Sequence, residues 1–523
     1  MRRAKIVCTI GPATSSAENI TRLVECGMDV ARLNLSHGEY AVHEQVYMDV
    51  RRASDEVGRA VGVLVDLQGP KIRTARFKDG PVVLTEGATF TITTREVPGD
   101  VHEVGTTYAG LAGDVEPGHR ILIDDGKLAL EVTDVTETDV VCTVLEGGVL
   151  SNNKGINVPG AAMSVPALSE KDKEDLRWAL RLKVDMIALS FVRSARDIVD
   201  VHAIMDEIGV RLPVIAKIEK PQAVENLDEI IRAFDGVMVA RGDLGVELPL
   251  EEVPLVQKRA CEIARRRAKP VIVATQVLES MIENSRPTRA EASDAANAVL
   301  DGADALMLSG ETSMGAHPFE AVTTMARIIE NTEDHGLHRI RPLDTRPNSK
   351  GGAVTAAAAE IGDQIGAKLL VTFSSTGDTT RRLARVRPRI PMIAFTSNQW
   401  TRSQLALTWG VETFLTAEVR HTDEYAVFVD TELLKAGRVV EGDQVVIVAG
   451  SPPGIPGSTN ALRVHRVGDA VVDGVEALRA RSDRGTDRNA GLRPNLRGGG
   501  RGLHRYHVEH VVSRVGSLFR LPG

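Results

Sequence analysis

Eight short runs rich in Val, Ile, Leu and Ala recur along the chain, and each is followed by a longer stretch with apolar residues at helical spacing. Near-continuous apolar strands that alternate with helices are typical of a parallel sheet covered on both faces. Eight such units are what a closed (β/α)8 barrel needs. The runs lie at residues 4–10, 30–36, 62–68, 185–191, 213–219, 236–242, 270–276 and 305–311.

Polar residues close most of these runs, and their position separates two possible folds. A doubly wound open sheet would show the same alternation of strands and helices. In barrels, however, sites are built where the strands end, so polar residues gathered at strand ends favour the α/β class with a (β/α)8 TIM barrel. The predicted rim residues are Arg32, Asn34, Ser36, Asp66, Ser190, Lys217, Glu219, Arg241, Asp243, Thr275, Ser309 and Glu311.

The rhythm breaks twice, which predicts two further domains. Residues 69–161 alternate polar and apolar positions between Gly, Asp and Pro turns, and we expect an inserted small β-barrel that acts as a lid. Residues 1–68 and 162–335 would form the catalytic barrel, and 336–470 an open α/β sheet domain with a regulatory role. The Arg- and Gly-rich tail, 471–523, is expected to be disordered; an altered reading frame or weak nucleic-acid binding are alternatives.

The composition excludes several classes of protein. The 523 residues include 43% hydrophobic and 26% charged residues, which excludes disorder over most of the chain. The net charge of −8 gives no reason to expect nucleic acid as the main partner. The four cysteines lie far apart without a CxxC pair, so neither a zinc site nor a disulfide framework is indicated. We recognise no export signal or membrane span and expect a cytoplasmic protein.

Two acidic residues at neighbouring strand ends predict a metal site. Glu219 and Asp243 close the fifth and sixth runs, so their carboxylates would converge at the rim of a barrel. Mg²⁺ and Mn²⁺ prefer such hard oxygen ligands, with substrate oxygens completing the shell. The alternative is that both acids form structural ion pairs with Lys217 and Arg241.

Three basic residues near the rim point to an anionic substrate. Lys217 lies two residues before Glu219, so both side chains project to the same face of the strand. There an ammonium stabilises a transferring phosphoryl group or an enolate, or simply forms a salt bridge to Glu219. Arg32 and Arg73 offer bidentate recognition of phosphate; taken singly, each is better explained as a solvated surface residue.

Small residues suggest two further binding positions. Thr275 could hydrogen-bond a carboxylate or relay a proton, or be a core threonine bonded to backbone, and Gly242 allows close approach of an anion. A loop rich in hydroxyl groups opens a helix in the last domain, where a phosphate could bind; plain helix capping would need only one of its residues. The loop residues are Ser374, Ser375, Thr376, Gly377 and Thr379.

Long stretches of residues 1 to about 470 resemble one family, pyruvate kinase. They are ARLNLSHG, LVDLQGPKIRT, KGINVPG, IAKIEK, VMVARGDLGVE, ATQVLESM, PTRAEASDAANAVLDGADALMLSGET and GSPPGIPGSTN. The resemblance implies Mg²⁺-dependent (or Mn²⁺-dependent) transfer of a phosphoryl group from phosphoenolpyruvate to ADP, the final step of glycolysis. Alternatives are another magnesium-dependent barrel enzyme acting on phosphoenolpyruvate or pyruvate, and a catalytically silent metabolite sensor.

The resemblance also implies a role for each matching residue. Glu219 and Asp243 would hold the divalent ion, and Arg32, Arg73 and Lys217 would neutralise charge during transfer. Backbone N–H groups of Gly242 and Asp243, with the hydroxyl of Thr275, would bind the substrate carboxylate. Nucleotide contacts are implied for Asn34, His37, Arg73 and Lys154. A monovalent cation position is implied for Asn34, Ser36, Asp66 and Leu67.

This chain departs from the potassium-dependent members at two positions. Lys71 replaces the glutamate of their GPEIR motif, and Leu67 stands where a threonine often contributes to the cation site. Because a fixed ammonium can replace a mobile cation, we expect activity without added K⁺. The family is commonly tetrameric with an effector site in the last domain, so we expect a homotetramer. The effector would be AMP or a sugar monophosphate bound at 374–379.

Overall fold

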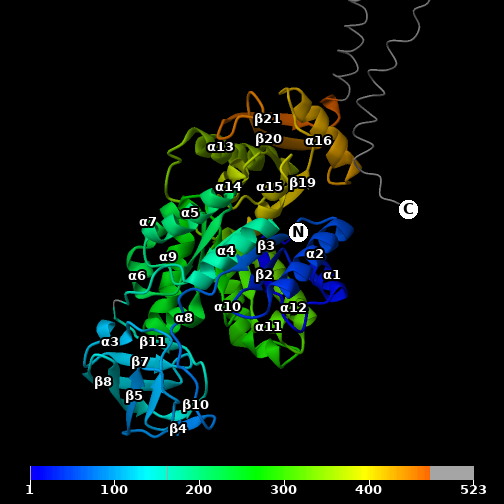
Figure 1. The fold of residues 1–523 in the computed structure, drawn as a ribbon. Coiled ribbons are helices and arrows are strands. Elements are labelled where there is room, and N and C mark those ends of the chain that lie inside the picture. The colour runs from blue at the N-terminus through cyan, green and yellow to red at the C-terminus, as the bar shows by residue number, and fades with distance from the viewer. Residues whose placement is uncertain (1, 162, 471–523) are drawn as a thin grey trace, which may run out of the picture. The chain divides into compact units, whose positions relative to one another are not determined.

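Eight parallel strands close into a barrel in the computed structural model, which describes residues 2–161 and 163–470 (Figure 1). Around the barrel the strands follow the order β1-β16-β15-β14-β13-β12-β3-β2. The predicted (β/α)8 barrel is thereby confirmed, whereas the tail predicted to be disordered lies outside the described residues. The barrel strands are β1 (Lys5–Thr9), β2 (Val30–Asn34), β3 (Gly62–Asp66), β12 (Met186–Leu189), β13 (Val214–Ile218), β14 (Gly236–Ala240), β15 (Val271–Ala274) and β16 (Ala305–Leu308).

The barrel strands are apolar throughout because both of their faces are buried. One face fills the barrel interior, where Val7, Leu64, Ile215 and Met238 belong to a single cluster. The other face packs on the surrounding helices in a second, larger cluster. Each strand stops one to three residues before its apolar run does, so the last polar residues of most runs lie just beyond the strand.

Helices connect successive strands on the outside of the barrel (Figure 1). Their start positions follow local chemistry: Ser169 and Asp172 form a reciprocal capping box at α4, and Thr288 and Glu291 form another at α10. The helices are α1 (Ala17–Cys26), α2 (Tyr40–Val57), α4 (Glu170–Leu182), α5 (Ile198–Ile208), α6 (Pro221–Glu225), α7 (Leu227–Ala233), α8 (Arg241–Glu247), α9 (Val253–Arg266), α10 (Arg289–Leu300), α11 (Gly310–Ser313) and α12 (Pro318–Gly336).

An aspartate repeats at the amino-terminal end of every second barrel strand. Each stands directly before its strand and accepts a hydrogen bond from a backbone N–H of the preceding barrel strand. The repeat therefore ties the strands into four consecutive pairs at one end of the barrel. The bonds join Asp29 to Ile6 (2.8 Å), Asp185 to Val63 (2.7 Å), Asp235 to Val214 (2.9 Å) and Asp304 to Val271 (3.1 Å).

The insertion between β3 and β12 is a β domain with its own core. Six strands follow the order β11-β7-β8-β9-β5-β6, and β10 pairs with β4 separately. Isolated bridges from Arg73 to Gly155 and from Thr74 to Thr106 bring the two edges of the six-stranded sheet toward each other. The elements are β4 (Val82–Leu84), β5 (Thr89–Thr93), β6 (Glu103–Gly105), α3 (Leu111–Asp114), β7 (Arg120–Ile123), β8 (Leu128–Val135), β9 (Asp139–Glu146), β10 (Gly148–Leu150) and β11 (Ile156–Asn157).

The C-terminal sheet has five strands in the order β19-β18-β17-β20-β21. Four are parallel, as the strand–helix alternation predicts, but β21 is antiparallel to β20. The connection 451–458 is too short for the crossover that a parallel strand requires. The elements are α13 (Lys350–Ile365), β17 (Leu369–Phe373), α14 (Asp378–Ala384), β18 (Met392–Thr396), α15 (Gln399–Gln404), β19 (Val411–Leu415), α16 (Glu424–Lys435), β20 (Gln444–Gly450) and β21 (Thr459–Arg466).

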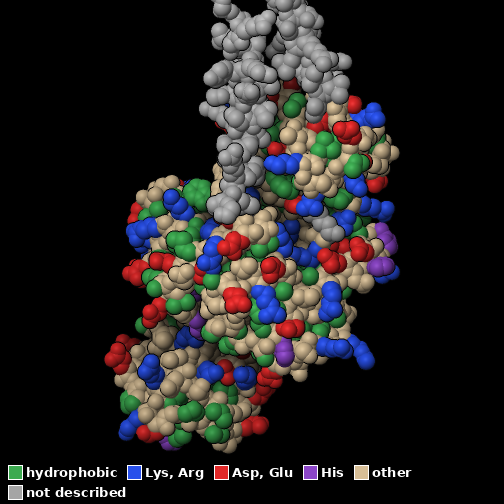
Figure 2. Space-filling model, turned by 90° about the vertical axis from the view of Figure 1, so that its right-hand side faces the viewer, with side chains coloured by type: hydrophobic (Ala, Val, Ile, Leu, Met, Phe, Trp, Pro, Cys, Tyr) green, Lys and Arg blue, Asp and Glu red, His purple; other side chains and the backbone are tan. Residues whose placement is uncertain are grey.

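The surface carries charges of both signs. On the face shown in Figure 2, Lys and Arg side chains are interspersed with Asp and Glu side chains. Within residues 2–161 and 163–470, every helix is too short or too polar to cross a membrane. The domain limits drawn from the sequence stay a prediction.

Candidate active site

Lys217 lies at the centre of a buried charge cluster at the carboxyl ends of the strands. Its ammonium is 2.9 Å from Glu219 Oε1 and 3.3 Å from Asp66 Oδ1, and it donates a hydrogen bond to Ser190 Oγ (2.9 Å). Only 11% of the Lys217 side chain is exposed, and both carboxylates are almost fully buried. The alternation of side chains in β13 thus brings Lys217 and Glu219 to one face, as predicted.

Arg32 completes this cluster from β2. Its Nε donates to Asp66 Oδ2 (2.8 Å), a second guanidinium nitrogen lies 2.7 Å from the same oxygen, and a third donates to Thr9 Oγ1 (2.9 Å). Asp66 therefore balances two cations, Arg32 on one carboxylate oxygen and Lys217 on the other. This arrangement fixes both cations at the barrel mouth before any substrate arrives.

One oxygen of Glu219 is poorly satisfied although it is buried. Glu219 Oε2 accepts a hydrogen bond from the backbone N–H of Phe191 (2.7 Å). Oε1 pairs with Lys217, but at an angle that makes no hydrogen bond, so this oxygen has no hydrogen-bond donor. The Lys217 ammonium compensates part of the charge of this buried oxygen, and the missing hydrogen bond leaves the oxygen able to bind a further cation.

Burial and neighbouring charges shift the pKa values of the three groups in this cluster. Burial alone would lower the pKa of the Lys217 ammonium, but Asp66 and Glu219 outweigh it and raise that pKa. Burial opposes ionisation of Asp66 as well, yet Lys217 and Arg32 hold its pKa below the usual value. Burial raises the pKa of Glu219, opposed by Lys217 and reinforced by nearby Asp243. Lys217 is therefore a permanent cation rather than a base.

Thr275 and Gly242 meet beside Asp243 at the ends of β14 and β15. The Thr275 hydroxyl accepts the Gly242 N–H (2.7 Å) and donates to the carbonyl of Ala274 (2.6 Å). Thr275 has a φ of 66°, an unfavourable value for a β-branched residue. Arg241 stabilises this turn by donating to the Thr275 carbonyl (2.9 Å) while its guanidinium pairs with Asp294 (2.7 Å).

Glu219 and Asp243 fit a divalent ion of the magnesium type. Asp243 is half-buried in the first turn of α8, close enough for its charge to raise the pKa of Glu219. A cation between them would relieve this repulsion and compensate Glu219 Oε1. Within residues 2–161 and 163–470 no group of three or more His, Cys, Asp or Glu side chains is arranged to hold a metal. Two carboxylates with substrate oxygens and water are what Mg²⁺ uses in phosphoryl-transfer sites.

The residues implied for the monovalent cation lie near the cluster, but Lys71 does not join them. Asn34 Oδ1 accepts the Ser36 N–H (3.2 Å), and the Leu67 carbonyl accepts the Ser190 hydroxyl (2.8 Å). Lys71 instead lies against Gly155 and lines a cavity of about 50 Å³. Among the contacts of the described residues, none links its ammonium to Asn34, Ser36 or Asp66.

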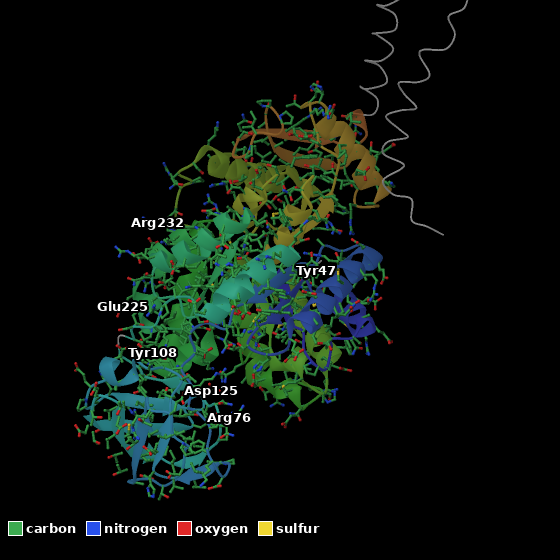
Figure 3. The ribbon with its side chains drawn as sticks, viewed as in Figure 1. Tyr47, Arg76, Tyr108, Asp125, Glu225 and Arg232 are labelled. Carbon is green, nitrogen blue, oxygen red and sulfur yellow. The ribbon has the colours of Figure 1, made fainter. Side chains whose placement is uncertain are left out.

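The residues expected to bind nucleotide are spread over two domains. His37 is exposed after β2. Arg73 donates to the Asn153 carbonyl (3.0 Å) within the insert. Lys154 pairs with Asp124 (2.9 Å) in the same domain, whose residues Arg76, Tyr108 and Asp125 are labelled in Figure 3. These assignments stay predictions.

The predicted effector loop lines a separate cavity in the C-terminal domain. Ser374, Ser375, Thr376 and Thr379 border a space of about 150 Å³. Thr459 faces them and forms a hydroxyl–hydroxyl hydrogen bond with Thr379 (2.5 Å). Gly377 instead takes a φ of 81° at the start of α14, where a side chain would collide with Arg381 and Leu405.

Several supporting residues escaped the sequence reasoning. Thr9 and Asp294 orient Arg32 and Arg241, and the backbone of Phe191 binds Glu219. A threonine at a strand end and an aspartate within a helix carry no signal of their own. Ser190, which donates to the Leu67 carbonyl and accepts from Lys217, was among the rim residues predicted from the sequence.

Comparison with known proteins decides which enzyme carries such a site. The family model described as "Pyruvate kinase, barrel domain" matches residues 1–322, and "Pyruvate kinase, alpha/beta domain" matches residues 352–465. The chain belongs to the pyruvate kinase family. The family resemblance that the sequence motifs indicated is thereby confirmed.

Individual pyruvate kinases are similar over most of the chain. The pyruvate kinase of Mycobacterium intracellulare is 60% identical over 468 residues, which cover 90% of this chain and 99% of that protein. The pyruvate kinase of Corynebacterium glutamicum is 58% identical over 468 residues, which cover 90% and 98%. A crystal structure of a pyruvate kinase from Cryptosporidium parvum superposes with a TM-score of 0.84 at 35% identity, covering 89% of this chain and 96% of that one.

Family membership makes the protein an enzyme, a phosphotransferase of glycolysis. It implies phosphoenolpyruvate and ADP as substrates and a requirement for a divalent metal ion. The buried rim carries fixed cations, which suits the transfer of a phosphoryl group from one anionic substrate to another.

Proposed function

We propose that the rim cluster around Lys217 transfers the phosphoryl group of phosphoenolpyruvate to ADP, with Glu219 and Asp243 as the protein ligands of Mg²⁺. Mn²⁺ has the same ligand preference and would substitute for it. The observation that carries the proposal is the buried Glu219 Oε1, which has Lys217 beside it but no hydrogen-bond donor. Such an oxygen is ready to accept a metal ion at a point where two fixed cations also face the substrate.

Each chain residue then has a role that follows from its contacts. Arg32 and Lys217 present fixed positive charge to the phosphoryl group, and because the pKa of Lys217 is raised, it acts through charge rather than by taking a proton. The bound metal ion supplies further neutralisation of the phosphoryl oxygens. Arg73 and Lys154 would bind the nucleotide from the insert, together with Asn34 and His37 on the barrel side.

The turn of Thr275 and Gly242 would bind the carboxylate of the substrate. The Gly242 N–H now bonds the Thr275 hydroxyl, and that hydroxyl donates to the Ala274 carbonyl, so a carboxylate would exchange these two internal hydrogen bonds for two to the ligand. The N–H of Asp243 would contribute as well. The Thr275 hydroxyl would also stand near the path of the proton that reaches the enolate.

A coupled assay of pyruvate formation from phosphoenolpyruvate and ADP tests the assignment. Glu219→Gln and Asp243→Asn should each abolish most activity and weaken Mn²⁺ binding measured directly on the protein. Glu225→Gln removes the same charge from the exposed surface of α6 and should change neither quantity (Figure 3). Normal Mn²⁺ binding by Glu219→Gln would disprove this metal site.

We further propose that the enzyme needs no added K⁺. The support for this proposal is that both carboxylate oxygens of Asp66 already lie within ion-pair distance of a fixed cation, Arg32 or Lys217. Lys71 replaces the glutamate of potassium-dependent members, but its ammonium lies away from Asp66 in this structure. Turnover in a buffer with tetramethylammonium as the only monovalent cation should equal turnover with K⁺. A steep K⁺ requirement would contradict the proposal.

Regulation is proposed at the cavity of the C-terminal domain. Hydroxyl groups of Ser374, Ser375, Thr376 and Thr379 border it, and they suit the phosphate of AMP or of a sugar monophosphate. Either ligand should shift the phosphoenolpyruvate saturation curve, and Thr376→Glu should abolish the shift while leaving the unactivated kinetics unchanged. No shift with any of these ligands would remove the proposal.

Assembly and location are proposed on the resemblance to the family. We expect a homotetramer in solution, which sedimentation will test. We expect the enzyme in the cytoplasm; its four cysteines are unpaired in the structure, which suits a reducing compartment.

A further inference from the structure

The segment that returns from the insert to the barrel is tied down by one carboxylate. Asn157, at the end of β11, donates from its side-chain amide to Glu247 Oε1 across the domain boundary (2.7 Å). Glu247 is the last residue of α8 and only 6% exposed. Because Glu247 is a buried carboxylate, the hydrogen bond that it accepts is stronger than one at the protein surface.

A lysine from a third element binds the same oxygen. Lys220 Nζ lies 2.5 Å from Glu247 Oε1, and its ammonium lies 5.6 Å from the centre of the Phe191 ring. The backbone N–H of Phe191 in turn binds Glu219. We call Asn157, Glu247 and Lys220 the latch.

The latch residues are placed next to both proposed metal ligands. Lys220 follows Glu219 directly in the chain. Glu247 lies four residues after Asp243 in α8, so the two side chains project from the same face of the helix, one turn apart. Glu247 and Asp243 lie in one helix, and Lys220 and Glu219 are adjacent in the chain. A shift of Glu247 would therefore be transmitted to Asp243, and a shift of Lys220 to Glu219.

We propose that the latch couples the seating of the inserted domain to the position of Glu219 and Asp243. Asn157, Glu247 and Lys220 are then positioning residues: they touch no substrate, but the divalent ion binds best when the insert is latched. The inference rests on the proposed metal site. It adds to that site the contacts through which the position of the insert affects binding of the metal ion.

Direct Mn²⁺ binding separates this role from a merely structural one. The free Mn²⁺ remaining in a titration without substrate is measured by its electron paramagnetic resonance signal. Asn157→Ala should raise the dissociation constant about three- to tenfold, below the roughly 10- to 100-fold typical when a direct hydrogen-bond partner of a ligand is lost. Lys220→Met should have a similar effect, and the double variant should lose less than the product of the two.

A matched control lies in the same domain. Asn152 accepts a hydrogen bond from the backbone N–H of Phe77 (2.8 Å), a contact wholly within the insert. Asn152→Ala should lower thermal stability at most, with Mn²⁺ binding unchanged. If Asn157→Ala and Lys220→Met also change only the melting temperature, the latch is a structural contact and the proposal is overturned.

Glu219→Gln distinguishes failure of the latch from failure of the metal site. Loss of Mn²⁺ binding in Glu219→Gln, together with normal binding in both latch variants, would reject the latch alone. Normal binding in Glu219→Gln would reject the metal site itself.

Discussion

The two ends of the barrel both bury charge, but they satisfy it in different ways. At the amino-terminal end, four aspartates repeat in register and each accepts a backbone N–H of the neighbouring strand. At the carboxyl end no such repeat exists: Arg32, Asp66, Lys217 and Glu219 come from three strands and compensate one another. One end is periodic because its task is the same for every strand pair, whereas the other is irregular because it faces a ligand.

The difference also shows in what remains unsatisfied. Asp304 at the first end accepts two backbone N–H groups and pairs with Arg387 (3.2 Å). Glu219 at the other end keeps one buried oxygen without a donor. Stability therefore concentrates where polar groups are fully paired, and chemistry concentrates where one is not. Exceptions occur at the stable end too: Asp185 has one unpaired oxygen and a pKa raised by burial to about 6, and Arg387 Nε and Trp409 Nε1 make no hydrogen bond.

Replacing a buried lysine at each end should separate the two functions most strongly. Lys217→Met should lower kcat by about 10³- to 10⁵-fold, the range known for a cation that stabilises a transferring phosphoryl group. Lys5 in β1 is similarly buried but donates to the Val411 carbonyl (2.8 Å). Lys5→Met should lower only stability. Equal losses of kcat in the coupled assay would break the comparison.

Removing an aspartate of the repeat should cost stability without changing catalysis. Asp304→Ala removes the carboxylate partner of the buried Arg387 and leaves two backbone N–H groups without an acceptor, and the free energy of unfolding should fall by about 3 to 5 kcal/mol. Denaturant unfolding measures this, with kcat/KM of the folded fraction unchanged. The exposed Asp334 offers a control, since Asp334→Ala should change stability by less than about 0.5 kcal/mol.

Asp185 predicts a pH dependence at the stable end. Because its folded-state pKa is raised, its contribution to stability is present below the unfolded value near 3.8 and is lost as pH rises through about 6. Asp185→Asn removes this titration. From pH 4 to pH 7, the variant should therefore gain about 2 to 3 kcal/mol relative to the wild type in urea unfolding. A pH-independent difference would contradict the assignment.

The exposed member of the repeat should matter least. Asp235 binds the Val214 N–H like the others, but its side chain lies at the surface. Water can replace that bond, so Asp235→Asn should lower the free energy of unfolding by about 1 kcal/mol or less. A loss as large as that of Asp304→Ala would show that burial does not determine how much each aspartate of the repeat contributes to stability.

Sequence reasoning located the barrel strands because their apolar runs are buried on both faces. It failed at their ends: the run 270–276 stops as a strand at Ala274, since Thr275 and Gln276 take positive φ values that no residue type there announces. It also missed the repeat, although GMDVARL, KVDMIAL, AFDGVMV and GADALML each place an aspartate directly before a strand.

The site was predictable in part for the same reason. The alternation of strand side chains places Lys217 and Glu219 together, because they lie two residues apart at the end of β13. The pairing of Arg32 with Asp66 and that of Asn157 with Glu247 join residues 34 and 90 positions apart in the chain. Such contacts depend on the register between strands of the closed barrel and on how the insert is seated, and local pattern gives neither the register nor the seating.

The bond between Asp185 and Val63 has a meaning for how this architecture tolerates change. These residues flank the entire insert, 122 positions apart, yet they fasten β3 to β12 at the end away from it. The barrel is thus closed by a bond between the two strands that flank the inserted domain. Because this bond does not involve the insert, insertions, deletions or replacement of the inserted domain would leave the pairing of β3 with β12 intact.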